Sequence, residues 1–468
     1  MNRSVPLILA VALFMENMDS TVIATSLPAI AADIGASPIA LKLALTSYLV
    51  SLAVFIPISS WMADRVGAKR VFRWAIAVFV LGSICCAVSG SLVEFVAARF
   101  LQGMGGAMMT PVARLVLLRT TPKRELVSAM AWLTVPALLG PLVGPPVGGF
   151  ITTYASWHWI FLINVPIGIA GNFFAGRLLP EIEQREPRPI DARGFMLSGI
   201  AASGLVFGLS VISLPALPLW VGFATLAIGA VAAALYVRHA RRHPAPILDF
   251  RLFATPTFRA AVVGGFFFRI GIGAIPFLLP LMLQLGFGLT PFASGMLTFV
   301  SAFGAISMKF LAPFTLRTGG FRNVLIFSSF VGGVFVALNA AFSSSTPAAV
   351  IVGVLALGGF LRSLFFTSVN ALAVADIEPD DLGQATALSA VFQQFSVALG
   401  VAVAGGILEG ATLFGHGATS DAAFVAAFVG VGCITTLSCL SFVRLPADAG
   451  SGVSGQREKR RQEPTRPA

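Results

Sequence analysis

The feature that most constrains this chain is a succession of long apolar segments that runs from one end of the sequence to the other. A helix that crosses the roughly 30 Å hydrocarbon layer of a membrane needs about 20 such residues. Segments of this length are predicted near 5–31, 42–63, 71–90, 92–118, 126–153, 157–180, 193–212, 217–238, 257–284, 291–313, 323–342, 347–372, 383–408 and 421–445. The sequence therefore predicts an all-α, polytopic membrane protein with about 14 transmembrane helices.

Composition agrees with this prediction. Only 11% of the residues are charged, whereas soluble proteins carry about 25%, so a water-soluble core is excluded. A formal net charge of +11 would suit a nucleic-acid surface in a soluble protein. In a membrane protein it indicates basic loops, and no nucleic-acid partner is expected. Glu16 and Asp19 interrupt the first apolar stretch, which favours an uncleaved first helix over a signal peptide.

The basic residues are distributed unevenly between the two sets of loops. About 25 of the 31 Lys and Arg residues fall on one side, in or beside 64–73, 119–124, 185–188, 238–251, 317–322 and 457–466. The loops of the other side contain no Lys or Arg, and Lys42 stands alone at one edge. The positive-inside rule makes the basic side cytoplasmic, and an even number of helices leaves both termini there. We expect a multi-pass protein of the bacterial inner membrane.

The two longest charged links divide the chain into blocks of six, two and six helices. The expected units are an N-terminal six-helix bundle (1–180), two linker helices with flanking cytoplasmic loops (181–256), a C-terminal six-helix bundle (257–445) and a disordered cytoplasmic tail (446–468). The link DRVGAKR in the first bundle has a weak echo in LRTGGFR in the second. Repeated bundles are typical of secondary transporters, whose site lies near the midplane between the halves.

Several stretches of sequence together carry a family signature. They are ENMDSTVIATSLPAI (16–30), SSWMADRVGAKR (59–70), RFLQGMGGA (99–107), GPLVGPPVGG (140–149) and WHWIFLINVPIG (157–168). With these motifs the chain resembles the major facilitator superfamily, specifically its fourteen-helix drug:proton antiporter branch of EmrB/QacA type. The resemblance implies a proton-coupled secondary antiporter that exports small hydrophobic or cationic compounds by alternating access. The alternative is an exporter of one specific metabolite, because no motif specifies the substrate of such a fold.

Two of these motifs have expected mechanical roles. The resemblance implies that a cytoplasmic loop acts as a latch, through Asp64, Arg65, Gly67, Lys69 and Arg70; an ordinary charged reversal is the alternative. Physically, Gly67 permits a tight turn, and Asp64 can accept hydrogen bonds from basic groups.

The second motif has small residues that allow close helix approach, and a proline that bends its helix. The resemblance implies that this segment seals the outer side of the cavity, although close packing explains the glycine spacing equally well. Its residues are Gly140, Gly144, Pro145, Gly148 and Gly149.

Charged residues inside the predicted spans are candidates for the transport site, because each costs about 2.5–3.5 kcal/mol at the bilayer centre on insertion scales. Glu16 and Asp19 lie three residues apart and therefore share a face of the first helix. Arg99, followed by Gln102, matches the family residue that is linked to proton transfer. We expect Asp19 to exchange a proton for substrate, with Glu16 as the other candidate carrier. A purely structural ion pair between Asp19 and Arg99 is the alternative.

The second six-helix block also contains charged residues inside predicted spans, Arg269 and Arg362. Phe266, Phe267 and Phe268 precede Arg269 and are candidates to line an apolar cavity.

Other classes of function find little support. The four histidines, His158, His239, His243 and His416, show no metal-ligand spacing, so neither a metal site, a cofactor nor an enzyme is expected. An ATP-driven pump is disfavoured because the sequence contains no GxxxxGK[ST] loop. A membrane-embedded sensor remains an alternative function. The expected partners are a small-molecule substrate, protons and the lipid bilayer, and the expected state is a monomer.

Overall fold

The computed structural model describes residues 4–121, 126–181, 190–212, 218–244, 246–378, 381–415 and 417–450, and these are all helices and connections, without a strand. The α-helices are α1 (Ser4–Val22), α2 (Leu27–Asp33), α3 (Lys42–Val66), α4 (Ala68–Val88), α5 (Leu92–Thr120), α6 (Leu126–Tyr154), α7 (Trp159–Leu162), α8 (Asn164–Leu178), α9 (Ala192–Ile212), α10 (Leu219–Ala240), α11 (Pro256–Leu281), α12 (Pro291–Leu338), α13 (Ala348–Val374), α14 (Leu382–Gly410), α15 (Asp421–Leu437) and α16 (Leu440–Val443). Short 3-10 or π-helical turns are η1 (Ile23–Thr25), η3 (Phe250–Ala254), η4 (Met282–Gly286), η5 (Asn339–Ala341) and η6 (Ala411–Phe414). Most of the tail predicted at 446–468 lies outside the described residues.

The predicted all-α membrane fold is confirmed. Among the described residues, twelve helical segments are long and apolar enough to cross a membrane. Helices α5 and α6 have 29 residues each, which is also long enough, and with them the predicted number of about 14 is reached. The chain is therefore a multi-pass membrane protein.

Two details of the helices differ from the prediction. The first predicted segment is broken, because α1 ends at Val22 and α2 starts at Leu27, with a proline in the first turn that favours a helix start. Two predicted spans meet in α12 at a sharp bend, where Gly320 has a φ of 70°. Gly67, between α3 and α4, has a φ of 99°. Both values favour glycine, so the sequence echo between the two links corresponds to a similar backbone reversal.

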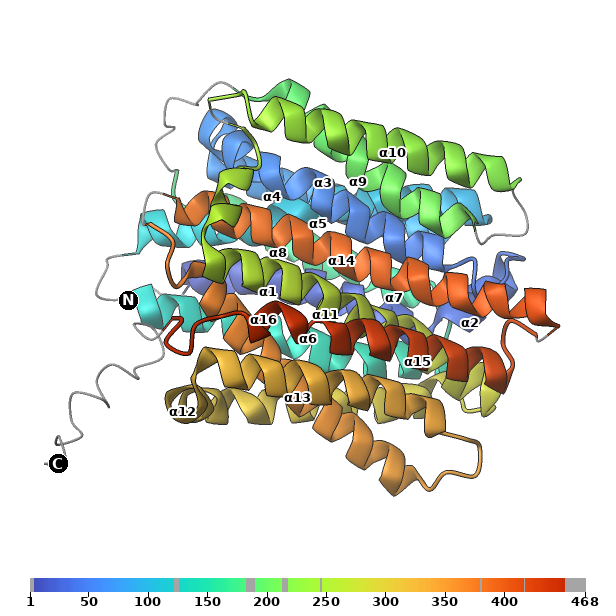
Figure 1. The fold of residues 1–468 in the computed structure, drawn as a ribbon. Helices are drawn as coiled ribbons and strands as arrows, with labels where there is room; N and C mark the ends of the chain where they lie inside the picture. Colours follow the sequence, from blue (N-terminus) through green and yellow to red (C-terminus); the bar gives the residue numbers. More distant parts are fainter. Residues whose placement is uncertain are drawn as a thin grey trace, which may run out of the picture.

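The helices pack in two sets that contact each other directly, and a hairpin of two further helices lies along one edge of the molecule (Figure 1). In the N-terminal set, α1 packs against α6 while α3 and α4 pack against α5; in the C-terminal set, α11 packs against α14 and α12 against α13. The hairpin of α9 and α10 lies beside α3 and α14, so it touches both sets. Val50 of α3, Val206 of α9 and Ala398 of α14 share one buried cluster.

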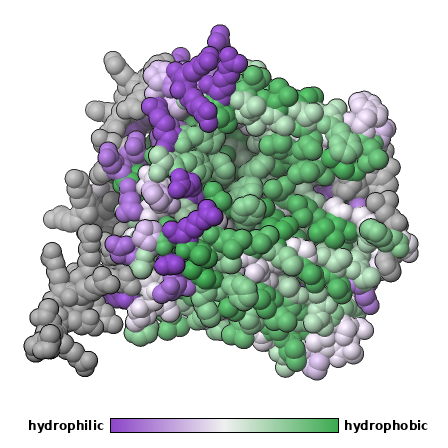
Figure 2. Space-filling view, in the orientation of Figure 1, coloured by the Kyte–Doolittle hydropathy of each residue, from purple (hydrophilic) through white to green (hydrophobic). Residues whose placement is uncertain are grey.

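The two sides of the molecule differ in polarity. The start of α1 and the end of α16 lie on the same side, which we call the terminal side; α2 lies toward the other, far side (Figure 1). Hydrophilic residues gather on the terminal side, next to a broad hydrophobic surface (Figure 2). Large apolar side chains are exposed in several helices, among them Val93, Trp220 and Phe314, whose exposed fractions are 79%, 70% and 67%. Such large exposed apolar side chains face lipid in a membrane protein.

Three large hydrophobic clusters show where the two sets of helices meet. One contains Phe72 and its neighbours, all from the N-terminal set, and another contains Phe365 and its neighbours, all from the C-terminal set. The third joins both sets, with Ile23 on one side and Phe277 and Phe428 on the other. Because this shared cluster includes the residues around α2, the two sets are packed together over the half of the molecule near the far side.

Candidate substrate and proton site

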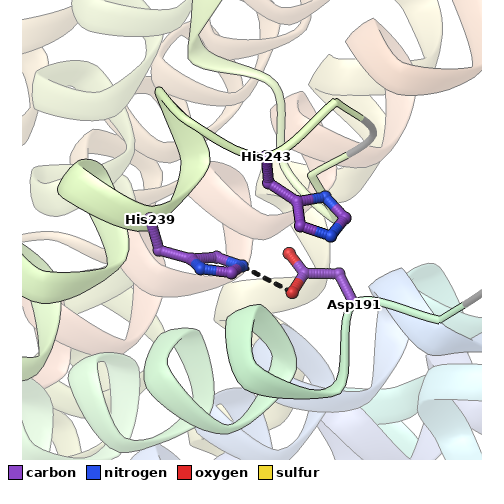
Figure 3. Close-up of side chains that lie close together, drawn as sticks. All are labelled: Asp191, His239 and His243. Carbon is purple, nitrogen blue, oxygen red and sulfur yellow. Dashed lines mark hydrogen bonds and ion pairs between the residues drawn. The ribbon is translucent and has the colours of Figure 1, made fainter.

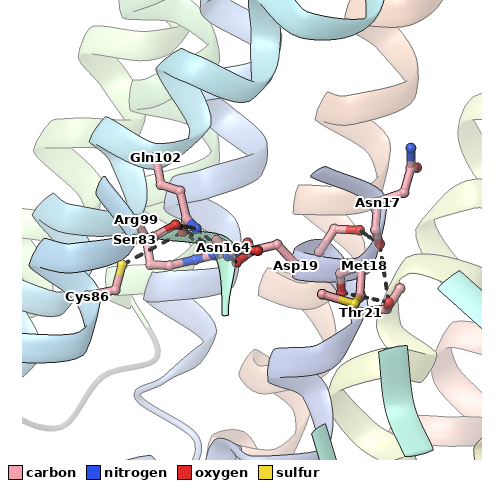
Figure 4. Close-up of polar contacts among 10 residues, drawn as sticks. Asn17, Met18, Asp19, Thr21, Ser83, Cys86, Arg99, Gln102 and Asn164 are labelled. Atoms are coloured by element: carbon pink, nitrogen blue, oxygen red, sulfur yellow. Dashed lines mark hydrogen bonds and ion pairs between the residues drawn. The ribbon is translucent and has the colours of Figure 1, made fainter. Parts of the chain in front are cut away.

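A buried polar cluster surrounds Asp19 in the middle of the N-terminal set (Figure 4). Arg99 Nη1 donates to Asp19 Oδ2 at 2.7 Å, while Gln102 Nε2 and Asn164 Nδ2 both donate to Asp19 Oδ1 at 2.8 Å. Gln102 Nε2 also donates to Ser83 Oγ at 2.7 Å. Helices α1, α4, α5 and α8 therefore each contribute to one network, in which three donors converge on a carboxylate that is 0% exposed.

The cation of this cluster is as deeply buried as the anion. Arg99 is 1% exposed, and its guanidinium lies 4.3 Å from the ring centroid of Tyr48 and 5.9 Å from that of Phe161. An aromatic face attracts a cation, but it does not neutralise one. The neighbouring Asp19 supplies the compensating charge, since an uncompensated buried charge is costly.

Glu16 lies nearly one helical turn before Asp19, and its partner is different. Thr110 Oγ1 donates to Glu16 Oε2 at 2.9 Å, and this is a neutral donor. Glu16 is partly exposed, in contrast to Asp19. The two acids thus share a helix face, as predicted, but only Asp19 joins the network of Arg99.

Close approach of three helices makes this network possible. A Cβ added at Gly82 of α4 would lie 2.6 Å from the Cα of Gln102, and a Cβ added at Gly103 of α5 would lie 2.6 Å from the carbonyl oxygen of Tyr48. No side chain fits in either place, so α5 packs directly against the backbones of its two neighbours. This brings Arg99 and Gln102 of α5 within reach of α1.

The glycine motif of α6 faces two different partners. A Cβ at Gly140 would meet the backbone nitrogen of Met18 at 2.8 Å, and side chains at Gly144 and Gly148 would likewise overlap α1. Gly149 instead lies against α12 of the other set, and Pro145 lies against Gly295 of that helix. Both roles considered for the motif are therefore compatible with its position, since one part packs within the N-terminal set and the other part faces the C-terminal set.

The loop that was predicted as a latch carries two ion pairs on the terminal side. Asp64 Oδ1 accepts from Arg119 Nη2 at 2.5 Å, and Lys69 Nζ lies 3.3 Å from Glu181 Oε1. Both pairs join residues of the N-terminal half of the chain, and Arg119 was not among the predicted latch residues.

Two other basic residues of this loop form no ion pair among the described residues. Arg65 lies over the ring of Trp61 at 5.4 Å, and Arg70 is exposed. Gly67 supplies the reversal between α3 and α4 with its positive φ. In this conformation, the described contacts of the loop hold the N-terminal helices to each other.

Arg269 and Arg362 do not join the cluster around Asp19. Arg269 Nη2 donates to Asn370 Oδ1 at 3.1 Å, and Arg269 lines a hollow between α11, α13 and α14. Phe266 lines the same hollow, whereas Phe267 is 39% exposed on the outside of the molecule. Arg362 lines a second hollow in the C-terminal set. Among the described residues, neither arginine forms an ion pair with a carboxylate.

A buried pair of charges between the two sets escaped the sequence analysis. Lys42, at the start of α3, is 0% exposed and lies across Gly405 of α14. Glu409, one turn further along α14, attracts it electrostatically. The only signal in the sequence was a single lysine in the otherwise non-basic far-side loops. Its acidic partner is 367 positions away, so spacing could not have revealed the pair.

Comparisons with known proteins agree with this fold. The family model of the Major Facilitator Superfamily matches residues 9–257 and 261–467. Two relatives bear the name "Putative multidrug resistance protein MdtD": one from Escherichia coli O6:H1, 36% identical over 466 residues, and one from Salmonella paratyphi B, 36% identical over 460 residues. Each alignment covers 97% of both chains.

Solved structures show the same architecture at low sequence identity. A D-xylose-proton symporter matches with a TM-score of 0.69 at 15% identity, covering 96% of this chain and 98% of that one. A POT family transporter in complex with 5-aminolevulinic acid matches with a TM-score of 0.69 at 14% identity, covering 95% and 96%. The resemblance predicted from the motifs is confirmed, and the chain belongs to the major facilitator superfamily.

Proposed function

We propose that this chain is a proton-coupled antiporter that exports small hydrophobic or cationic compounds by alternating access, as a monomer. The observation that carries the proposal is the pair of acids in α1. Glu16 is partly exposed, whereas Asp19 is buried and accepts a hydrogen bond from Arg99. The MdtD relatives, which are named for multidrug resistance, support the substrate class. Competition between a proton and a cationic substrate for one acid gives exchange without further chemistry.

We propose that Glu16 carries the proton in this conformation. Asp19 already accepts from three donors and is shut off from solvent, so neither a proton nor a substrate reaches it without breaking the cluster. Glu16 has a single neutral donor in Thr110 and is partly exposed. The cluster of Asp19 and Arg99 then holds α1 against α5 and positions Glu16.

We further propose that residues 1–180 and 257–445 are the two moving halves, linked by the hairpin within 181–256. The shared hydrophobic cluster closes the far side, supported by Gly149 against α12 and by Lys42 near Glu409. With the basic terminal side in the cytoplasm of a bacterium, this is a state closed to the outside. Opening requires those contacts to separate, while the latch loop then meets the C-terminal set.

The test is transport by the purified protein in proteoliposomes with an imposed pH gradient and a panel of cationic, neutral and anionic compounds. Wild-type protein is expected to accumulate cationic substrate against its gradient only while the pH gradient lasts. Glu16→Gln is expected to abolish this uphill movement but to retain downhill counterflow, because the substrate pathway survives without a titrating group. Glu94→Gln, the same change at an exposed acid, is the matched control.

Two outcomes would contradict the proposal. Flux of every compound that is indifferent to the pH gradient would refute proton coupling itself. Uphill efflux by Glu16→Gln at the wild-type rate, together with its loss in Asp19→Asn at a comparable amount of folded protein, would return the carrier role to Asp19. If the chain were an enzyme or a sensor, no substrate would accumulate in any of these assays.

A further inference from the structure

Three side chains with metal-binding donors meet where α9 begins and α10 ends, on the terminal side (Figure 3). His239 Nε2 lies 2.6 Å from Asp191 Oδ1. The His243 amide donates to the His239 carbonyl at 2.9 Å, so the helical turn continues past α10 and places both rings on one face. One donor atom from each of the three residues lies within 4.8 Å of the other two.

The backbone holds the carboxylate in place for this arrangement. Gly194 N–H donates to Asp191 Oδ1 at 2.8 Å, and the more distant Ile247 N–H lies 3.4 Å from Oδ2. A side chain at Gly194 would overlap the carboxylate. Burial acts to raise the pKa of Asp191, but the Gly194 N–H and His239 outweigh it and hold the pKa below its usual value. The group is therefore a fixed, ionised oxygen donor.

We propose that Asp191, His239 and His243 bind one divalent transition-metal ion of the zinc type. Two imidazole nitrogens and one carboxylate oxygen are a donor set that zinc accepts, with water as the fourth ligand. Two atoms bound to one zinc at about 2.0–2.2 Å lie at most about 4.4 Å apart. The donor atoms lie within 4.8 Å of one another, so binding requires the partly exposed His243 ring to turn toward the other two ligands. The ion takes the place of the hydrogen bond between His239 Nε2 and Asp191 Oδ1, and His239 then holds its ring proton on Nδ1.

Such an ion would fasten the hairpin to the connection that leads into α11. That connection already returns to α10, because Tyr236 OH donates to the Leu248 carbonyl at 3.0 Å and accepts from the Leu248 N–H at 2.8 Å. Leu248 and Tyr236 belong to one buried cluster with Phe258 of α11 and Leu388 of α14. The metal would thus stabilise the junction between the hairpin and the C-terminal set, a role separate from the exchange proposed at Glu16.

The test is zinc binding by the full chain, purified through an affinity tag without histidines, stripped with a chelator and titrated in detergent against a chromophoric competitor. One zinc ion per chain is expected. His239→Gln keeps a side-chain N–H for Asp191 but removes the ligand, and His243→Ala removes the other imidazole. Because even the loss of an outer-shell partner costs about 10–100-fold, each variant should weaken binding at least about tenfold.

His158→Ala is the matched control. His158 Nε2 also lies near a carboxylate, at 3.8 Å from Asp33 Oδ2, but among the described residues this pair belongs to no group of three ligand side chains. Unchanged zinc affinity in this variant, with loss in the two others, supports the site. The proposal is overturned if the wild type binds no stoichiometric zinc, or if folded His239→Gln and His243→Ala both bind it as the wild type does.

Discussion

The buried pair of Asp19 and Arg99 allows a quantitative test by a double-mutant cycle. Both side chains are at most 1% exposed and their charged atoms are 2.7 Å apart. Removing one member of a buried pair costs about 3–5 kcal/mol, because the other charge is left uncompensated. The insertion cost of a lone charge at the bilayer centre, about 2.5–3.5 kcal/mol, gives a similar figure. Asp19→Asn and Arg99→Met are therefore each expected to destabilise the protein by about 3 kcal/mol.

The double variant is expected to lose much less than the sum of the two. It contains no buried charge at this place, and the amides of Gln102 and Asn164 still find neutral partners. A coupling energy of at least about 2 kcal/mol should result, near the upper end of the range for contacting residues. This corresponds to more than about a tenfold change in the unfolding equilibrium.

The measurement is reversible unfolding in bicelles by steric trapping, with Glu94→Gln as a control for loss of a charge on the same helix as Arg99. That control should stay within about 0.5 kcal/mol of the wild type, since Glu94 is exposed. If the effects of Asp19→Asn and Arg99→Met add within about 0.5 kcal/mol, the two charges are energetically independent and our reasoning about Arg99 is wrong.

Three further predictions address the closure and the aromatic contact. In Gly149→Val the new side chain overlaps the backbone of α12, so the conformation with a closed far side should be destabilised by about 1–3 kcal/mol and transport should slow. The control Gly353→Val, at a glycine with nothing within 4 Å, should transport normally in proteoliposomes. Tyr48→Phe keeps the ring beside the guanidinium and removes a buried hydroxyl that lacks a partner among the described residues. Its stability should change by less than about 0.5 kcal/mol, while Tyr48→Ala should lose about 3–5 kcal/mol in the same unfolding assay. Lys42→Met leaves the charge of Glu409 uncompensated and should lengthen spin-label distances between the far-side ends of α3 and α14. Adding Glu409→Gln should restore the wild-type distances. Unchanged distances in both variants would exclude a gating role for Lys42 and Glu409.

The sequence alone was sufficient for the membrane fold and for its family. Hydropathy is a local property of each segment, so the long helices could be located one at a time. The reversal at Gly67 was also a local matter, because its backbone conformation depends on the glycine itself. The positive-inside rule likewise needs only the loop composition, and the orientation it predicts is still a prediction.

Only the tertiary structure determined which charged side chains contact each other. The side chains of Glu16 and Asp19 leave the axis of α1 in directions that differ by about 60°. Because of this difference Glu16 contacts Thr110 and Asp19 contacts Arg99. Arg269 resembled Arg99 as a charge in a predicted span, yet it lies in a hollow of the other set.

The same holds for pairs that are far apart in the chain. Lys42 lies across α14 near Glu409, and Asp191 meets His239, although 48 positions separate the latter two. Such partners depend on how helices rotate and cross when they pack, which no local pattern contains. Burial inside the membrane is a property that each segment carries by itself, whereas a contact belongs to two segments, and for that reason it required the folded protein.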